Sequence, residues 1–185
     1  SKKDLENIDL VIAIGGDGTV LSASHFITDK PLLAVNSNPS ASEGALTSIP
    51  LERLDEKLEQ LLKGDMEKVK HERIEITINN HIQDLLALNE VFIGNVKPYL
   101  ISKYSIFHNS IKETQFSSGL LFSTGTGSTG WFKSAGGAPF SPTEKYIKML
   151  VREPYSRNIK KTTVPSLTIK EDETIEIIPH SKFVL

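Results

Sequence analysis

The residues of this sequence best suited to chemistry are one aspartate set among glycines, in the run Gly15-Gly16-Asp17-Gly18-Thr19. Glycines let a ligand approach the backbone closely, and the N–H groups at the start of a helix can bind phosphate. A carboxylate repels phosphate, so Asp17 is better suited to accept a proton or to hold a hydroxyl group or a metal ion. A plain tight turn between a strand and a helix is the alternative.

A second polar feature interrupts an apolar run. Asn89 and Glu90 lie within residues 85–93, which we predict to form a buried strand. A buried carboxylate is costly unless it is paired or bonded to a ligand. The amide and the carboxylate could bind hydroxyl groups and base edges, or they could form a satisfied structural pair at an edge position.

A third feature is a loop rich in glycine and hydroxyl groups, with a predicted strand before it and a short predicted helix from Trp131 after it. The loop consists of Ser123, Thr124, Gly125, Thr126, Gly127, Ser128, Thr129 and Gly130. Its N–H and hydroxyl groups could cradle phosphate or ribose. The glycine spacing matches a dinucleotide-binding fingerprint only formally, because the loop follows a β-rich stretch, and Trp131 stands where a Walker A loop has lysine.

The elements that must position these residues form two predicted domains. Residues 8–14 and 31–36 are predicted to be buried parallel strands joined by a helix over 19–28. The loop 36–44, which begins at Asn36, should lie at the same sheet edge as the glycine–aspartate loop, where α/β sheets bind ligands. A leucine stripe over 51–62 predicts an amphipathic packing helix.

From about Lys70 the pattern changes to short strands. We predict a hairpin turning at Asn79-Asn80-His81, with further strands over 104–107, 119–123, 166–170 and 174–178. The predicted fold is an α/β parallel-sheet domain over 1–68, followed by a mostly-β sandwich over 69–185.

Composition narrows the functional classes. The net charge of −2 argues against a general electrostatic grip on nucleic acid, and no apolar run is long enough to span a membrane. The chain has no cysteine, and its histidines lack metal-ligand spacing. Arg152, Arg157, Lys160 and Lys161 are interpreted as solvated surface or, less often, phosphate contacts.

The three motifs, taken in this order, resemble the NAD kinase family. The resemblance is closest to its divergent mitochondrial branch, on the basis of Val35-Asn36, Ser42-Glu43-Gly44, residues 87–94, Ser117-Ser118-Gly119 with Trp131, and Arg152-Glu153-Pro154. Diacylglycerol and sphingosine kinases share the first motif but have a later glycine-rich motif with an Asn-Asp pair, which is not visible here.

The resemblance implies an α/β domain and a β-sandwich domain with NAD between them. It also implies phosphorylation of the 2′-hydroxyl of the adenosine ribose by ATP with Mg²⁺, with Asp17 as the base. Asn89 and Glu90 would hold the adenosine, Thr129 and Ser134 would line the pocket, and Trp131 would form an aromatic wall. The complete binding set that we expect is Gly15, Gly16, Gly18, Thr19, Asn36, Asn89, Glu90, Thr124, Gly125, Thr126, Gly127, Ser128, Thr129, Trp131 and Ser134, with no protein residue assigned to the metal.

Two alternatives stay open at this point: a lipid kinase of the same superfamily, and an inactive module that binds NAD or another nucleotide. The family has strands before its glycine–aspartate loop and a closing segment that we do not find here, so we expect a trimmed chain. We expect NAD and ATP as small-molecule partners, no nucleic acid or membrane, a homodimer or higher homo-oligomer, and an intracellular location in the mitochondrial matrix or cytoplasm.

Overall fold

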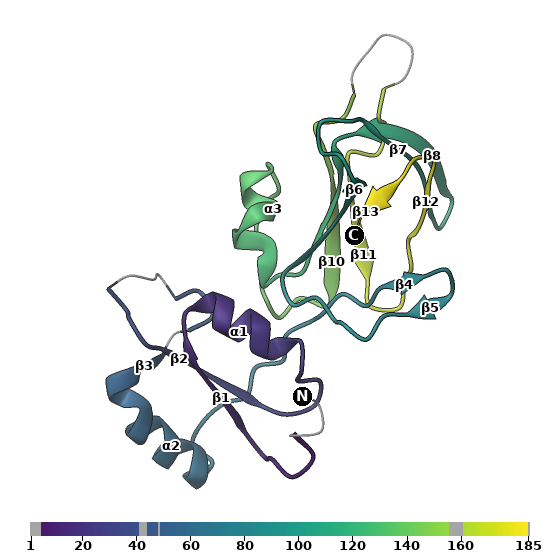
Figure 1. The fold of residues 1–185 in the computed structure, drawn as a ribbon. Helices are drawn as coiled ribbons and strands as arrows, with labels where there is room; N and C mark the ends of the chain where they lie inside the picture. The colour runs from purple at the N-terminus through teal and green to yellow at the C-terminus, as the bar shows by residue number, and fades with distance from the viewer. Residues whose placement is uncertain (1–4, 41–43, 48, 156–160, 185) are drawn as a thin grey trace. The chain divides into compact units, whose positions relative to one another are not determined.

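The protein is described by a computed structural model that covers residues 5–40, 44–47, 49–155 and 161–184. The chain divides into two compact units, residues 1–70 and residues 71–185 (Figure 1). Each unit has its own sheet structure and its own buried residues. Among the described residues, no helix has the length and apolar character needed to cross a membrane.

The first unit is built on a three-stranded parallel sheet. Its strands are β1 (Val11–Gly15), β2 (Leu32–Asn36) and β3 (Ile49–Pro50), in the order β1-β2-β3. The helix α1 (Asp17–Ser24) connects β1 to β2 and packs on β1. Branched and leucine side chains favour these strands, and Leu33 and Val35 are buried. The predicted βαβ unit is confirmed.

The helix α1 begins two residues earlier and ends four residues earlier than predicted. Gly16 is its N-cap, with an extended backbone, so Asp17 is the first helical residue. A carboxylate in the first turn interacts favourably with the positive end of the helix dipole. The range 19–28 was therefore wrong at both ends, because the chain turns into the helix immediately after the glycine pair.

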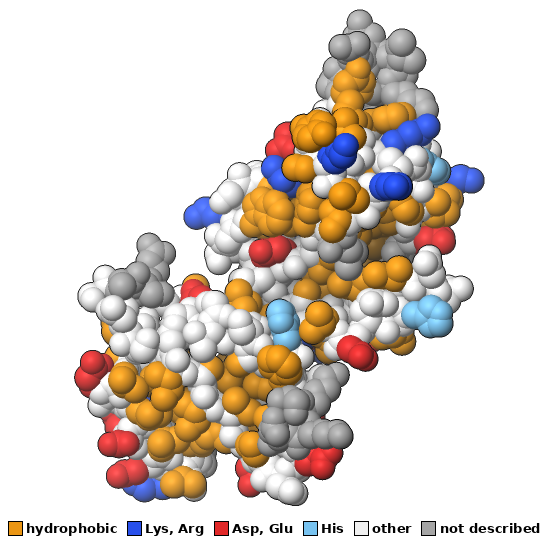
Figure 2. All heavy atoms as spheres, in the orientation of Figure 1, with side chains coloured by type: hydrophobic (Ala, Val, Ile, Leu, Met, Phe, Trp, Pro, Cys, Tyr) orange, Lys and Arg blue, Asp and Glu red, His pale blue; other side chains and the backbone are white. Residues whose placement is uncertain are grey.

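The helix over the leucine stripe is present but weakly packed. A 3₁₀ turn, η2 (Leu51–Arg53), leads into α2 (Leu54–Lys63), which ends at Gly64 with a left-handed φ of 78°. None of the α2 side chains is buried, and Leu62 is 86% exposed. Hydrophobic side chains also gather on the visible face of this unit (Figure 2). The prediction of a packing helix is thus correct for the helix and only partly correct for its packing.

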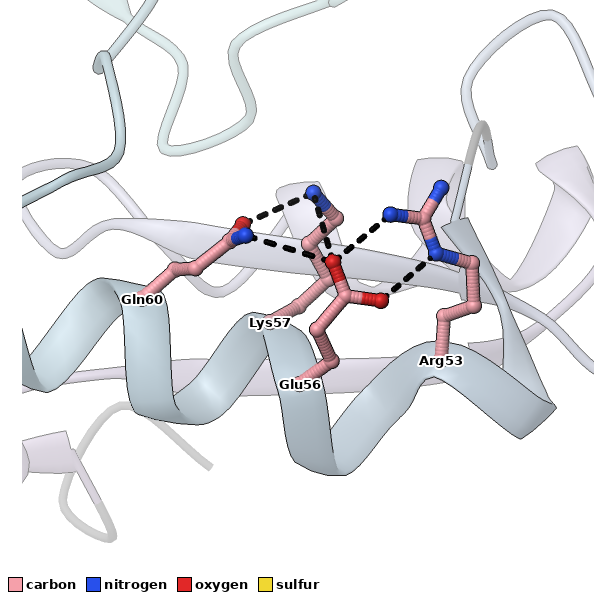
Figure 3. Close-up of polar contacts among 4 residues, drawn as sticks. All are labelled: Arg53, Glu56, Lys57 and Gln60. Carbon is pink, nitrogen blue, oxygen red and sulfur yellow. Dashed lines mark hydrogen bonds and ion pairs between the residues drawn. The ribbon is translucent and has the colours of Figure 1, made fainter.

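A polar network lies along the start of α2 (Figure 3). The Nε and Nη2 atoms of Arg53 donate to the two carboxylate oxygens of Glu56 at 2.8 and 2.7 Å. Gln60 donates to the same carboxylate, and Lys57 donates to the side-chain oxygen of Gln60 at 2.8 Å. Because the Arg53–Glu56 ion pair is exposed to solvent, it contributes little to stability, and we assign the network no chemistry.

The second unit contains two larger antiparallel sheets and a hairpin. The five-stranded sheet has the order β11 (Ser166–Lys170), β10 (Tyr146–Arg152), β9 (Gly119–Ser123), β6 (Glu90–Asn95) and β13 (Phe183–Val184). The three-stranded sheet has the order β12 (Glu176–Pro179), β7 (Ser102–His108) and β8 (Ile111–Ser117). The hairpin pairs β4 (Thr77–Ile78) with β5 (His81–Ile82).

One hydrophobic core joins the two larger sheets. Its buried residues come from strands of both, so the unit is a sandwich, as predicted. They are Ile74, Val91, Tyr104, Ile106, Leu120, Phe122, Met149, Val151 and Ile169. The sandwich holds the ends of β6 and β9 side by side, and the polar motifs lie at these ends.

The turns of this unit explain two of its hairpins. Asn79 and Asn80 have left-handed φ values of 50° and 64°, as a two-residue hairpin turn requires, and the predicted hairpin is confirmed. The turn between β7 and β8 contains Asn109, whose φ of 50° also lies in the left-handed region. After β9, a 3₁₀ turn η3 (Gly127–Thr129) and the short helix α3 (Trp131–Ser134) lie beside the five-stranded sheet (Figure 1).

Candidate functional site

The glycine–aspartate loop lies at the carboxyl edge of the parallel sheet. Gly15 ends β1 and pairs with Asn36, which ends β2, so Asp17 and Asn36 follow neighbouring strand ends. Asn36 is buried, and its side-chain oxygen accepts the N–H of Asn38 at 2.9 Å. This is the edge at which open α/β sheets bind ligands, as the sequence predicted.

The carboxylate of Asp17 is held by three donors from one short segment. The N–H of Ala45 donates to Oδ2 at 3.0 Å, and the N–H of Leu46 donates to Oδ1 at 2.9 Å. The hydroxyl of Thr47 also donates to Oδ1, at 3.2 Å. An ionised carboxylate has about four lone-pair sites, so the donors among the described residues leave one to accept a hydrogen bond from a ligand. Asp17 is therefore a fixed carboxylate with capacity for a further donor.

Gly44 shapes the segment that carries these donors. It has a φ of +66°, and a Cβ built on it would lie 2.6 Å from the carbonyl oxygen of Thr47 and 2.7 Å from Nδ2 of Asn36. Both the backbone conformation and the close approach therefore require glycine. Ser42 and Glu43, which belong to the family resemblance, lie outside the described residues. No pattern in the sequence connects Ala45, Leu46 or Thr47 with Asp17.

The glycines beside Asp17 differ in what they contact. A Cβ on Gly15 would overlap the side chain of Thr19, so these two residues pack directly on each other. A Cβ on Gly18 would meet nothing within 4 Å, and its φ is not left-handed. The contacts within this unit therefore do not require glycine at position 18. The absence of a side chain there leaves open surface on the first turn of α1, next to Asp17.

Asn89 and Glu90 lie at the start of β6 rather than inside a longer strand. Within residues 85–89, the only β-type pairing is the isolated bridge between Ala87 and Ile74. The predicted strand 85–93 was wrong at both ends, since β6 begins at Glu90 and ends at Asn95. The start is displaced because the carbonyl groups of Leu88 and Asn89 accept hydrogen bonds from Thr124 of the glycine-rich loop. The N–H of Thr124 donates to the carbonyl of Asn89 at 3.0 Å, and its hydroxyl donates to that of Leu88 at 2.6 Å.

Both polar side chains of this pair keep unused capacity. Oδ1 of Asn89 is buried and has no hydrogen-bond partner among the described residues. Glu90 is half-buried, and its burial raises the pKa of its carboxyl group above the ordinary value. A buried acceptor without a donor calls for an explanation, which a ligand N–H or hydroxyl group would supply.

Three hydroxyl groups of the glycine-rich loop are used inside the protein. Ser123, Thr124 and Ser128 are fully buried, and the hydroxyl of Ser123 donates to the carbonyl of Thr124 at 2.9 Å. The hydroxyl of Thr124 also accepts the N–H of Gly127 at 3.2 Å, and that of Ser128 donates to the carbonyl of Gly125 at 2.7 Å and accepts the N–H of Phe140 at 3.0 Å. These side chains hold the loop in shape, and the exposed Thr129 is left to present its hydroxyl group to a ligand.

Two loop glycines allow tight packing. A Cβ on Gly125 would overlap the backbone of Ser141, and a Cβ on Gly127 would lie 2.5 Å from the carbonyl oxygen of Asn89. The glycine-rich loop thus lies directly against the Asn89-Glu90 pair. Two of the three predicted motifs are brought together within the second unit.

The outward part of this loop includes one contact that the sequence did not indicate. Thr126 Oγ1 lies 2.9 Å from Nδ1 of His71. Burial, followed by the charge of Arg73, lowers the pKa of His71, so its neutral form is favoured near neutral pH. Thr129 and Ser134 are exposed, and Ser134 donates to the carbonyl of Gly130 at 3.3 Å.

Trp131 completes the surface. Its ring packs on Phe92 with centroids 5.3 Å apart, and 39% of the residue is exposed. Glu90 and Phe92 point to the same side of β6, because side chains alternate along a strand. The carboxylate of Glu90 and the indole of Trp131 therefore lie on the same side of the sheet.

The described residues contain no cluster of three or more His, Asp or Glu side chains that could hold a metal ion. Mg²⁺ commonly binds through substrate phosphates with one or two carboxylates, so a dedicated cage is not required for a phosphoryl-transfer site. Asp17, Asn36 and Gly44 are grouped in the first unit, and Asn89, Glu90 and the glycine-rich loop are grouped in the second.

Comparison with known proteins points to one family. Residues 2–66 match the family model described as the ATP-NAD kinase N-terminal domain. The chain is 32% identical over 184 residues to an NAD kinase of Clostridium botulinum, and 29% identical over 201 residues to a probable NADH kinase of Oryza sativa subsp. japonica. Each match covers 96% of this chain and 62% of the relative, so the chain spans about two thirds or less of these curated proteins.

Solved structures show the same fold. A crystal structure of yeast NADH kinase complexed with NADH aligns with a TM-score of 0.80 at 23% identity, over 98% of this chain and 51% of that one. An NAD kinase from Archaeoglobus fulgidus in complex with ATP aligns with a TM-score of 0.74 at 24% identity, over 96% and 67% of the two chains. In its matched residues the chain is thus similar to NAD kinases, and these solved structures share its fold.

Proposed function

We propose that this protein transfers a phosphoryl group from ATP to the 2′-hydroxyl of the adenosine ribose of NAD, giving NADP. The observation that carries the proposal is the carboxylate of Asp17, fixed by the amides of Ala45 and Leu46 at a sheet edge suited to ligands. Phosphoryl transfer depends mainly on positioning and charge stabilisation, so a fixed carboxylate next to open surface suits it. The proposal concerns the whole protein, because the chain spans only part of its relatives' length.

In this proposal Asp17 orients the ribose hydroxyl and accepts its proton. The three donors from residues 45–47 set the direction of the carboxylate before the substrate arrives. The open surface at Gly18 and the N–H group of Gly16 would receive phosphate oxygens. Asn36 supports the same edge from the neighbouring strand.

The second unit would hold the adenosine of NAD. The buried, unpartnered Oδ1 of Asn89 would accept an N–H or hydroxyl group of the ligand, and Glu90 would accept a ribose hydroxyl. Trp131 would provide an aromatic wall, with Thr129 and Ser134 at its margin. Asp17 in the first unit and Asn89 and Glu90 in the second unit are each assigned to NAD in this proposal.

Mg²⁺ would accompany ATP and neutralise charge on its phosphates. The phosphates supply most of the ligands for such an ion, so no set of protein ligands is assigned. Four further expectations stay predictions: the resemblance to the mitochondrial branch, the domain limits 1–68 and 69–185, the homodimer or higher homo-oligomer, and the intracellular compartment.

A direct test combines calorimetric titration with NAD and NADH, and an enzyme-coupled assay for NADP or NADPH with ATP. Binding followed by turnover supports the proposal. Binding without turnover would favour the inactive module. Turnover of diacylglycerol or a sphingoid base without binding of NAD or NADH would favour the lipid kinase, to which the relatives named above lend no support.

A further inference from the structure

Arg152, interpreted from the sequence as solvated surface, is largely covered in the structure. Its side chain is only 26% exposed. The guanidinium carbon lies 5.2 Å from the ring centroid of Trp131 and 5.9 Å from that of Phe92. The interpretation as solvated surface was wrong, because aromatic rings from two other segments cover the end of this strand.

Phe92 lies flat on the sheet because two neighbouring positions have no side chain. A Cβ on Gly94 would lie 2.6 Å from the Phe92 ring, and a Cβ on Gly119 would lie 2.8 Å from it. Gly119 pairs with Arg152 across the strands β9 and β10. The two glycines thus allow Phe92, Trp131 and Arg152 to meet as one packed group.

Packing, rather than solvation, keeps the guanidinium in this position. Its Nη2 donates to Glu153 at 2.9 Å, but its Nε is buried and has no hydrogen-bond partner among the described residues. Leaving an N–H unpaired is unfavourable, so the contact with the rings must compensate for it. A planar guanidinium stacks on aromatic faces, whereas the ammonium of lysine does not.

We propose that Arg152 is a positioning residue that holds the indole of Trp131 in place as a wall of the nucleotide pocket. Trp131 belongs to the short helix α3, whose four residues offer little support of their own. Arg152 contacts the indole from β10, and the exposed part of Trp131 is left for a ligand. The role of Trp131 as a pocket wall rests on the proposed binding of NAD, whereas the contact between Arg152 and the indole does not.

The first test needs no ligand. Trp131 is the only tryptophan of the chain, so its fluorescence anisotropy and its quenching by acrylamide report on this side chain alone. Arg152→Met and Arg152→Lys should both lower the anisotropy and raise the quenching constant. Lys112→Met, which removes a cation from the Phe107 ring on the other sheet, should change neither. Unchanged fluorescence in correctly folded Arg152→Met, which removes both the charge and the planar group, would overturn the proposal.

The second test is a double-mutant cycle on NAD binding. Removing the cation–π contact should weaken binding by about 2- to 30-fold in Arg152→Met. In a Trp131→Ala background the same substitution should have no further effect. Equal weakening with and without Trp131 would contradict positioning through the indole. A parent protein that binds neither NAD nor NADH would refute the proposed function, and the fluorescence comparison would still decide the contact between Arg152 and Trp131.

Discussion

The carboxylate of Asp17 and the backbone N–H of Leu46, which are 29 residues apart in the sequence, form a hydrogen bond of 2.9 Å. This bond links the first turn of α1 to the segment after Gly44. Together with the donors from Ala45 and Thr47, it fixes the one acidic side chain of the glycine loop. The segment 45–47 thus has a role in the site that its sequence does not reveal.

Thr47→Val should weaken both stability and turnover. Thr47 is 2% exposed, and its hydroxyl donates to Asp17. Loss of this hydrogen bond should cost about 0.5–1.5 kcal/mol of unfolding free energy. A less firmly oriented carboxylate should lower kcat by up to about 100-fold. Urea unfolding and the coupled assay measure the two effects, and Thr47→Ser, which keeps the hydroxyl, is the control. Loss of stability with unchanged kcat would show that Thr47 does not orient Asp17.

Gly44→Ala should be more damaging than the same change at Gly64. Both glycines have left-handed backbone, but only Gly44 has atoms where a Cβ would stand. The left-handed conformation costs about 1–2 kcal/mol in each variant, and overpacking adds about 1–3 kcal/mol at Gly44. Gly44→Ala should also reduce turnover. Equal melting temperatures for the two variants would be inconsistent with the described turn.

Glu90→Gln should stabilise the free protein at neutral pH and weaken its binding of NAD. Burial raises the pKa of Glu90, so the folded state disfavours the charged carboxylate. Below the ordinary glutamate pKa of about 4.3 both states are protonated, and the two proteins should be equally stable. As the pH rises through the raised folded-state pKa, the parent should lose stability relative to the variant. Melting temperatures of the parent and the variant across this pH range test the prediction. A Glu90→Gln variant less stable than the parent at pH 7 would contradict it.

Two threonines of the glycine-rich loop should respond in opposite ways. Thr124→Val would leave a buried carbonyl and an N–H without a partner, at a cost of about 1–3 kcal/mol. Thr129 is exposed, so Thr129→Val should change stability by less than about 0.5 kcal/mol while weakening the binding of NAD. Denaturant unfolding and calorimetric titration of both variants separate the two roles. If Thr129→Val bound NAD as tightly as the parent protein, Thr129 would not be part of the NAD pocket.

The elements predicted well from the sequence are those with strong local signals. The parallel strands come from apolar runs that glycine and proline interrupt, and the Asn79-Asn80 hairpin comes from two residues that tolerate left-handed backbone. The strands β8 and β10 were not predicted. The buried residues of β8 are the polar Gln115 and Ser117, so no apolar alternation marks this strand, and the pairing with β9 and β11 that makes β10 an inner strand joins segments distant in sequence.

The candidate site was predicted as residue types rather than as contacts. The sequence indicated Asp17, Asn89 and Glu90, because a polar residue in an apolar or glycine-rich run is unusual. The partners of these residues come from elsewhere in the chain: residues 45–47 for Asp17, and Thr124 for the carbonyl of Asn89. Arg152 was misread because only the folded sheet brings Phe92 and Trp131 against it.

In the proposed reaction, the carboxylate of Asp17 assists phosphoryl transfer to the ribose hydroxyl. Asp17→Asn keeps an oxygen to accept the N–H of Leu46, so the fold should persist, but it removes the proton acceptor. We predict that kcat for NAD falls by about 10²- to 10⁴-fold, while the dissociation constant for NAD changes much less. A variant that retains near-full turnover would contradict the account.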